Sequence, residues 1–271
     1  MADEQTDRGR EEPDEKLRLG GMALSNGVLV HGPTSWAAAV RTEDGELKVV
    51  AERKRVKGSK IDKPLLRGPA RLAESFAVLP RLKRSLPEAR LPFEGRAALA
   101  SLVGTAVAIS AVRRAKLGAA SEELVAGILS VAPAVLSLRR GQLAAYHGAE
   151  HIAIGTYEQD APTGKEHERC GGHLVGPLLA TATFANLLAA KAPENVRPAA
   201  RLAGSLGAVA AATEIFGWMQ RNPDRSLARA LSFPGHELQH RFSTAEPSAE
   251  QLEVAEAALN ACLDLESQND G

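Results

Sequence analysis

The pattern of apolar and polar positions divides the chain into a short strand-forming part and a long helix-forming part. Residues 27–30 and 36–40 are apolar and flank the turn-prone pair Gly32-Pro33. A third segment, residues 47–51, follows Glu43-Asp44-Gly45-Glu46, which is a strong hairpin signal. We therefore predict a small N-terminal β meander with one face available for packing.

After Pro64 the pattern becomes helical. Residues 66–82 carry apolar side chains at near-helical spacing, and residues 248–265 combine an amphipathic pattern with a capping box, Ser248-x-x-Gln251. Between them lie four stretches with few or no formal charges, at residues 97–112, 124–138, 171–190 and 202–220. These patterns predict long, mostly apolar helices.

The four apolar stretches raise the question of a membrane. A spanning helix needs about 20 apolar residues, and residues 171–190 reach that length but include threonine, asparagine and proline. Apolar residues make up 44% of the chain and aromatic residues 4%, a composition that favours closely packed small side chains. The predicted class is α+β, mainly α: a small N-terminal β meander followed by a bundle of alanine-rich helices, either buried or inserted into a membrane.

The strongest chemical signal is a cluster of histidines. Six of the seven histidines lie between residues 147 and 240. His147-x-x-Glu150-His151 places two imidazoles on one helix face, one turn apart. That spacing suits two ligands of one tetrahedral zinc ion, with Glu150 beside them as a catalytic base. It is the inverted zinc-protease signature; the structural alternative is two histidines hydrogen-bonded within a helical bundle.

Three further residues are candidates to complete the metal sphere. His167 and Cys170 are three positions apart, and both residue types bind zinc. Glu214 is the one carboxylate within residues 202–220, where a buried charge is costly unless it is paired or metal-bound. A salt bridge or interhelical hydrogen bond explains Glu214 equally well, and a buried thiol is the alternative for Cys170.

A second signature occurs near the C-terminus. His236-Glu237-Leu238-Gln239-His240 matches HExxH, the forward zinc-protease motif. Pro234-Gly235 leaves a short helix start, and Asn260 stands where a downstream glutamate ligand would be expected. We expect this match to be a coincidence on a surface helix.

Charge and cysteine content limit the classes of partner. The 33 basic and 33 acidic residues give a formal net charge of zero, which does not favour nucleic-acid binding. Residues 48–71 are locally basic, so binding to acidic lipid headgroups is a further alternative. Cys170 and Cys262 do not form a disulfide framework, and the polar N-terminus does not resemble a secretory signal. We expect a reducing compartment.

Several longer motifs carry a family resemblance. They are Leu19-Gly20-Gly21-Met22-Ala23-Leu24-x-Asn26-Gly27-Val28, Leu66-Arg67-Gly68, Tyr146-His147-Gly148-Ala149-Glu150-His151, His167-x-Arg169-Cys170-Gly171, Pro234-Gly235-x-x-Leu238-Gln239 and Glu246-Pro247-x-x-x-Gln251-Leu252-Glu253-Val254-Ala255. They resemble the bacterial YqhQ-like group, a domain of unknown function described as a predicted metal-dependent enzyme. The resemblance runs from about residue 17 to residue 265.

The resemblance implies a membrane protein. Typical members are multi-pass proteins whose histidine and cysteine motifs lie close to membrane-embedded helices, and they carry a glutamate in the helix that contains Glu214. It implies membrane association at the cell membrane, multi-pass or peripheral, with the metal site facing the cytoplasm. A cytoplasmic location is the alternative.

Together these patterns predict a zinc-type, metal-dependent hydrolase of unspecified substrate. The catalytic residue is Glu150, and the predicted ligands of a divalent metal ion, Zn²⁺, are His147, His151, His167, Cys170 and Glu214. The alternative is a non-catalytic, membrane-associated helical protein with a structural His/Cys metal site. The predicted organisation is a disordered acidic tail (1–16), a β region (17–64), a helical metal-binding domain (65–265) and a disordered tail (266–271).

Overall fold

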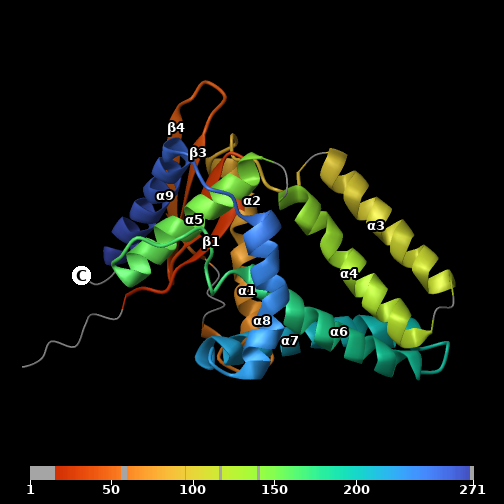
Figure 1. The fold of residues 1–271 in the computed structure, drawn as a ribbon. Helices are drawn as coiled ribbons and strands as arrows, with labels where there is room; N and C mark the ends of the chain where they lie inside the picture. Colours follow the sequence, from red (N-terminus) through yellow and green to blue (C-terminus); the bar gives the residue numbers. More distant parts are fainter. Residues whose placement is uncertain (1–15, 56–59, 95, 116–117, 139–140, 269–271) are drawn as a thin grey trace, which may run out of the picture.

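The fold combines one small sheet with a larger set of helices (Figure 1). The computed structural model describes residues 16–55, 60–94, 96–115, 118–138 and 141–268, so the predicted tail 1–16 lies outside the described residues except for its last residue. The sheet is antiparallel, with strand order β1-β2-β3-β4. Its strands are β1 (Gly20–Leu24), β2 (Gly27–His31), β3 (Ser35–Arg41) and β4 (Leu47–Arg53).

The predicted meander is confirmed, with one strand added. The β3–β4 hairpin turns at the predicted acidic segment, where Gly45 has a φ of +80° and the Thr42 amide donates to the Glu46 carbonyl. The additional strand is β1, which pairs with β2 so that Gly21 lies opposite Val30. Its Gly-Gly start and short length hide the alternation on which strand prediction depends.

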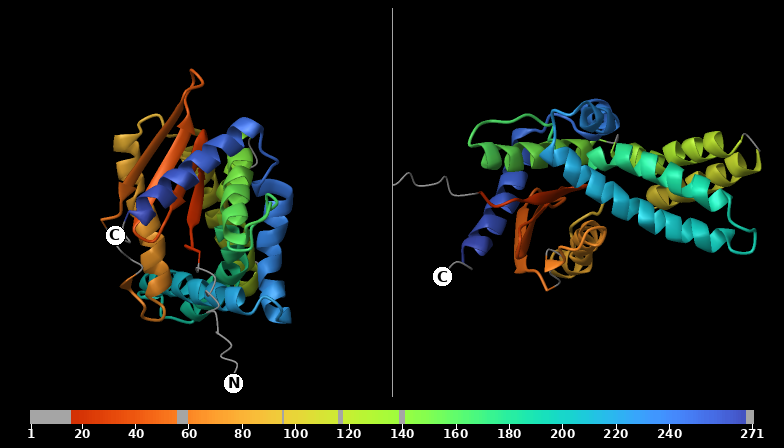
Figure 2. Two further views of the ribbon diagram at one scale, coloured as in Figure 1. Left: turned by 90° about the vertical axis from the view of Figure 1, so that its left-hand side faces the viewer. Right: turned by 90° about the horizontal axis from the view of Figure 1, so that it is seen from below.

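The sheet is covered on both faces rather than one. Figure 2 shows it between α2 (Leu79–Ser85) on one side and α5 (Gln142–Gln159) with α9 (Ala249–Ser267) on the other. Alternating residues of β2 and β3 therefore enter two cores: Val28, Val30, Ala37 and Ala39 pack toward α5 and α9, and Leu29, Trp36, Ala38 and Val40 toward α2. This is why both strands are buried along almost their whole length.

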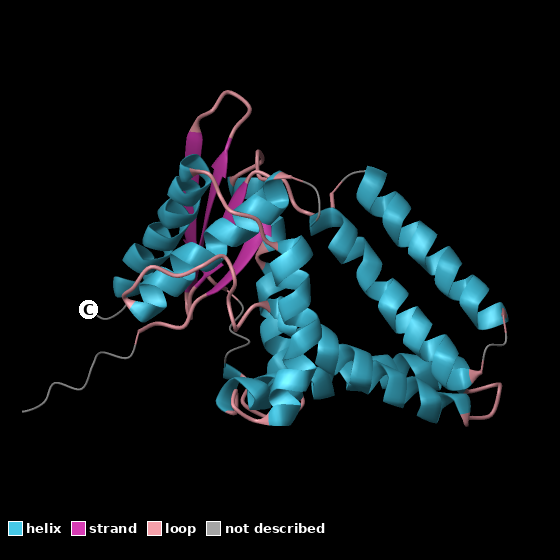
Figure 3. Cartoon of the chain, in the orientation of Figure 1, coloured by secondary structure: helices cyan, strands magenta, loops and turns pink. Residues whose placement is uncertain are grey.

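The helices make up most of the chain, in agreement with the predicted mainly α class (Figure 3). The stretch 66–82 forms two helices, α1 (Arg67–Ala77) and α2, because Pro80 favours the first turn of a new helix. The remaining long helices are α3 (Arg96–Arg114), α4 (Ala119–Leu138), α6 (Val175–Ala190), α7 (Arg197–Arg221) and α8 (Ser226–Leu238). The short helices η2 (Gly171–Leu174) and η3 (Gln239–Ser243) precede α6 and follow α8.

Four helices form an arm that extends away from the sheet. In this helical arm, α3 packs on α4, α4 on α6 and α6 on α7 (Figures 1 and 2). Among the described residues, Gly171–Ala190 and Arg197–Arg221 are long and apolar enough to cross a membrane. Core helices of soluble proteins pass the same test, but only 22% and 17% of the apolar 18-residue windows of these two segments is buried.

The C-terminal helix begins with a capping box and is bonded to the sheet near its end. The predicted capping box is confirmed: the Ser248 hydroxyl accepts from the Gln251 amide, and the Gln251 side chain accepts from the Ser248 amide. At the other end the buried Glu266 carboxylate accepts hydrogen bonds from Thr34 and Ser35. The predicted tail 266–271 thus begins too early, because α9 continues to Ser267; residues 269–271 lie outside the described residues.

Candidate metal centre

Helix α5 presents His147 and His151 side by side, as their spacing predicts. The two imidazole centroids are 4.4 Å apart. Each Nδ1 lies 2.7 Å from a backbone carbonyl oxygen, that of Ser243 for His147 and that of Lys165 for His151. A carbonyl only accepts, so each Nδ1 carries the proton and each Nε2 keeps a free lone pair. This is the usual arrangement of metal-binding histidines.

Cys170 reaches the same place from a different segment. It has an extended backbone at the start of η2, where its Sγ accepts from the Gly172 amide, and the same Sγ lies 3.5 Å from His147 Nε2. The ligand atoms of His147, His151 and Cys170 all lie within 4.8 Å of one another. A tetrahedral zinc ion with ordinary Zn–N and Zn–S bonds separates nitrogen from sulfur by about 3.5 Å. The donor set and its spacing therefore fit one such ion.

Burial keeps the three candidate ligands uncharged. It lowers the pKa of His147, and it lowers that of His151 to about 2 with a further contribution from His147. Burial also raises the pKa of the Cys170 thiol to about 12. Neutral imidazoles are the form that binds metals, whereas the thiol needs a cation to lose its proton. The pocket thus disfavours Cys170 as a free nucleophile, and only a bound cation would make its thiolate available as a ligand.

Glu150 lies beside the three ligands without joining them. Its carboxylate is buried, with Oε2 3.9 Å from His147 Nε2, and burial raises its pKa to about 7 against the opposing effect of His167. Strand β1 passes directly over it, since a Cβ built on Gly21 would lie 2.2 Å from Glu150 Oε1. The carboxylate is therefore held in place by the sheet next to the ligand atoms.

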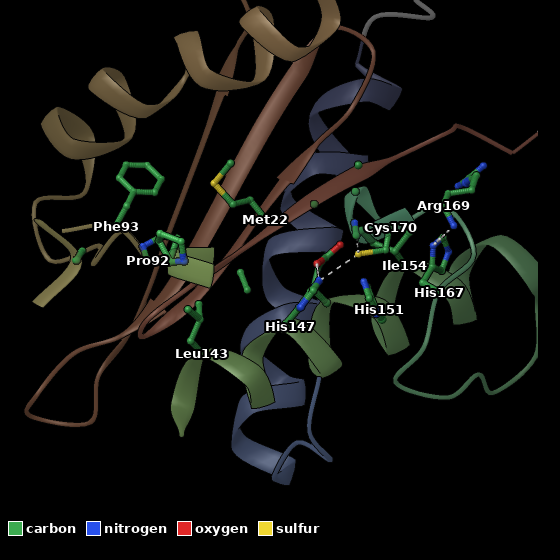
Figure 4. Close-up of a pocket in the computed structure, with 18 of the residues that line it drawn as sticks. Met22, Pro92, Phe93, Leu143, His147, His151, Ile154, His167, Arg169 and Cys170 are labelled. Carbon is green, nitrogen blue, oxygen red and sulfur yellow. Dashed lines mark hydrogen bonds and ion pairs between the residues drawn. The ribbon is translucent and has the colours of Figure 1, made fainter. Parts of the chain in front are cut away.

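The ligands lie on the wall of a cavity of about 590 Å³ (Figure 4). Glu150, His167 and Arg169 line it as well, together with apolar residues of β1, α3, α4 and α5. The volume lies within the range of roughly 300–1,000 Å³ that is usual for small-molecule sites. A molecule larger than water can thus reach the face of the cluster that the protein leaves open.

The structure does not bring the other two predicted ligands into the three-residue group. His167 lines the cavity, but its Nε2 lies 3.3 Å from Glu158 Oε2 and its ring centroid is 5.6 Å from that of His151. The Glu214 carboxylate accepts hydrogen bonds from Nε and Nη2 of Arg67. The structure therefore shows a salt bridge, which was the alternative to metal binding. An arginine fork already satisfies this carboxylate.

The HExxH match lies on the surface, as expected. His236 and His240 are more than half exposed, and both face Glu166, with His240 Nδ1 2.8 Å from its Oε1. The match spans the end of α8 and the π-helical η3, so its two rings stack at a centroid distance of 6.3 Å.

Two residues of a motif noted in the sequence have a supporting role that the sequence did not predict. Gln239 is buried. Its side-chain oxygen accepts a hydrogen bond from the His167 backbone amide, and its side-chain nitrogen donates one to the His167 carbonyl. Gly235 lies so close to the segment after Cys170 that a Cβ would be 2.6 Å from the Gly172 carbonyl oxygen. Both belong to the Pro-Gly-x-x-Leu-Gln motif, and its place in the family resemblance was the available signal. This motif positions the loop that carries Cys170.

Comparison with known proteins finds similarity for the segment that carries this centre. A family described as protein of unknown function (DUF1385) matches residues 138–265, which include every residue of the three-ligand group. The uncharacterized protein YqhQ of Bacillus subtilis (strain 168) is 32% identical over 130 residues, 45% of this chain and 41% of that protein. The chain thus spans about two fifths of the relative's length. No solved structure matches. Residues 138–265 are therefore similar to a family of unknown function, and 130 residues of the chain are similar to YqhQ.

Proposed function

We propose that this protein is a metal-dependent hydrolase with a single zinc-type ion held by His147, His151 and Cys170. The observation that carries the proposal is the group of three ligand atoms within 4.8 Å on the wall of an open cavity. Structural zinc sites use four protein ligands, whereas catalytic sites use three and leave a position for water or substrate. His167, bonded elsewhere, leaves that fourth position open.

The surrounding residues supply the remaining requirements of hydrolysis. A bound divalent ion polarises a carbonyl or a water molecule. Glu150, from its position beside His147, accepts the proton of the attacking water and returns it to the leaving group. Arg169 is also in the cavity wall, but its guanidinium pairs with Glu158 and so orients the loop rather than the substrate. Glu150 is thus the one group we assign to proton transfer.

The test compares Glu150→Gln with Glu166→Gln, a matched change at the exposed histidine pair. Metal content is measured by elemental analysis, and hydrolysis is measured with panels of p-nitrophenyl esters and fluorogenic peptides. We expect Glu150→Gln to keep its metal and to lose about 10²- to 10⁴-fold in hydrolysis rate, and Glu166→Gln to keep both. Full activity in Glu150→Gln, with unfolding of Cys170→Ser, would instead indicate a structural metal site.

We also propose that the helical arm associates with the cell membrane and that the metal centre faces the cytoplasm. The low burial of α6 and α7 supports the first part. Cys170 forms no disulfide in the structure, and its proposed role as a ligand requires a reduced thiol, which persists in the cytosol; this supports the second part. Carbonate extraction of membranes tests the association: recovery of the whole protein in the soluble fraction without extraction would refute it.

A further inference from the structure

The cavity has two chemically different ends. The candidate ligands, Glu150, His167 and Arg169 form the polar end, and apolar side chains from β1, α3, α4, α5 and the loop before α3 form the other. Figure 4 shows the two ends on opposite sides of His147, with Arg169 and His167 to one side and Phe93 and Met22 to the other. Pro92, Leu102, Pro133 and Leu143 are among the other apolar lining residues, whereas Ile154 lies on the side of Cys170 and His167. A ligand that fills both ends must itself be amphipathic.

The apolar end opens toward an apolar surface of the helical arm. Phe93 and Leu102 line the cavity although they are 48% and 53% exposed. Leu99 and Val103, the neighbours of Leu102 on α3, are exposed by 63% and 56% and lie outside the cavity lining. An apolar group can therefore pass from the surface of α3 into the cavity along apolar side chains.

The side chains of the apolar end provide almost no partners for a polar ligand. Ser101 and Ser130 supply its hydroxyl groups among the described lining residues, and both donate to carbonyls of their own helices, those of Ala98 and Gly127. A sugar or a peptide brings amides or hydroxyls that cost free energy when they are buried without partners. A hydrocarbon chain brings none.

We infer that the substrate is a single-chain amphiphile, an ester or amide of a fatty acid. Its hydrocarbon chain fills the end near Phe93 and Leu102, and its carbonyl lies at the His147–His151–Cys170 cluster. The position of the carbonyl rests on the proposed hydrolase; the position of the chain rests on the apolar end alone. Hydrolysis of such a substrate adds water across the acyl bond and releases a fatty acid and an alcohol or amine.

The test measures how the purified full chain binds a dansyl-labelled undecanoic acid, displaced by octanoate, decanoate or dodecanoate. Because each buried methylene group strengthens binding by about fourfold, dodecanoate should displace the probe at a far lower concentration than octanoate. Leu102→Gln should weaken probe binding about tenfold or more, since it places an amide at the apolar end. Leu99→Gln, on the same helix outside the cavity, should leave binding unchanged.

Three results would overturn the inference: no dependence on chain length, equal effects of the two glutamine variants, or displacement by N-acetyl-trileucine amide at the concentration that dodecanoate requires. Metal content of the same samples separates this inference from the proposed function. Chain-length-dependent binding by a protein without metal would support the hydrocarbon site and refute the hydrolase. Bound metal without a dependence on chain length would refute the hydrocarbon site and leave the proposed metal centre supported.

Discussion

The contact between Gly21 and Glu150 makes the sharpest structural prediction. An alanine at position 21 would place its Cβ 2.2 Å from Glu150 Oε1, 2.4 Å from Cδ and 2.6 Å from Cγ. Gly21 does not have a left-handed backbone, so alanine costs nothing in backbone strain. The whole effect comes from the collision with a buried carboxylate between β1 and α5. Overpacking of this kind costs about 1–3 kcal/mol.

The preceding glycine provides a matched control. A Cβ on Gly20 meets nothing within 4 Å, so Gly20→Ala should change stability by less than about 1 kcal/mol and can be stabilising. Urea denaturation measures both variants. Gly21→Ala should also lose hydrolysis while it keeps its metal, because Glu150 lies beside the ligands and is displaced by the new methyl group. Equal stability and equal activity of the two variants would refute the assigned contact.

Three further predictions concern the scaffold. Burial, then the nearby lysine, lowers the pKa of His31 from 6.5 to about 4, so the unfolded state takes up a proton first as the pH falls. His31 should therefore contribute about 2 kcal/mol to the loss of stability between pH 7 and pH 5 in denaturant titrations, and His31→Leu should make that loss smaller by about this amount, whereas the share of the other buried histidines remains. Glu266→Ala should lower the free energy of unfolding by about 2–3 kcal/mol in the same assay, because it leaves the Thr34 and Ser35 amides of the β2–β3 turn without a hydrogen-bond acceptor. A decrease under about 0.5 kcal/mol would contradict this. Gly235→Ala should weaken metal binding by pushing the Cys170 loop away, whereas Gly171→Ala, with open space around it, should bind metal normally in a zinc-chelator competition.

The local features of this fold could be predicted because each depends on a few neighbouring residues. The turn at Gly45 and the capping box of Ser248 and Gln251 are set by short-range chemistry. The facing of His147 and His151 follows from helical periodicity alone. These elements needed no knowledge of what packs against them.

The long-range features could not be predicted in the same way. Nothing near Glu214 in the sequence indicates that Arg67 satisfies it across 147 positions. The second face of the sheet is buried because α9, more than 200 residues later, packs on β2 and β3 opposite α2. Cys170 joins the histidines, and His167 does not, because Gln239 and Gly235 fix the loop that carries both. These long-range contacts are determined by tertiary packing, which the local sequence pattern does not contain.

Cobalt substitution tests the central claim most directly. Zinc is spectroscopically silent, whereas Co²⁺ bound by a thiolate gives an intense near-ultraviolet charge-transfer band. Cys262 lies on α9, is buried against Ser35 and is the natural control. We predict the band in the wild type and in Cys262→Ser and its loss in Cys170→Ser. A wild type that binds no cobalt, or a band that survives in Cys170→Ser, would contradict the metal centre.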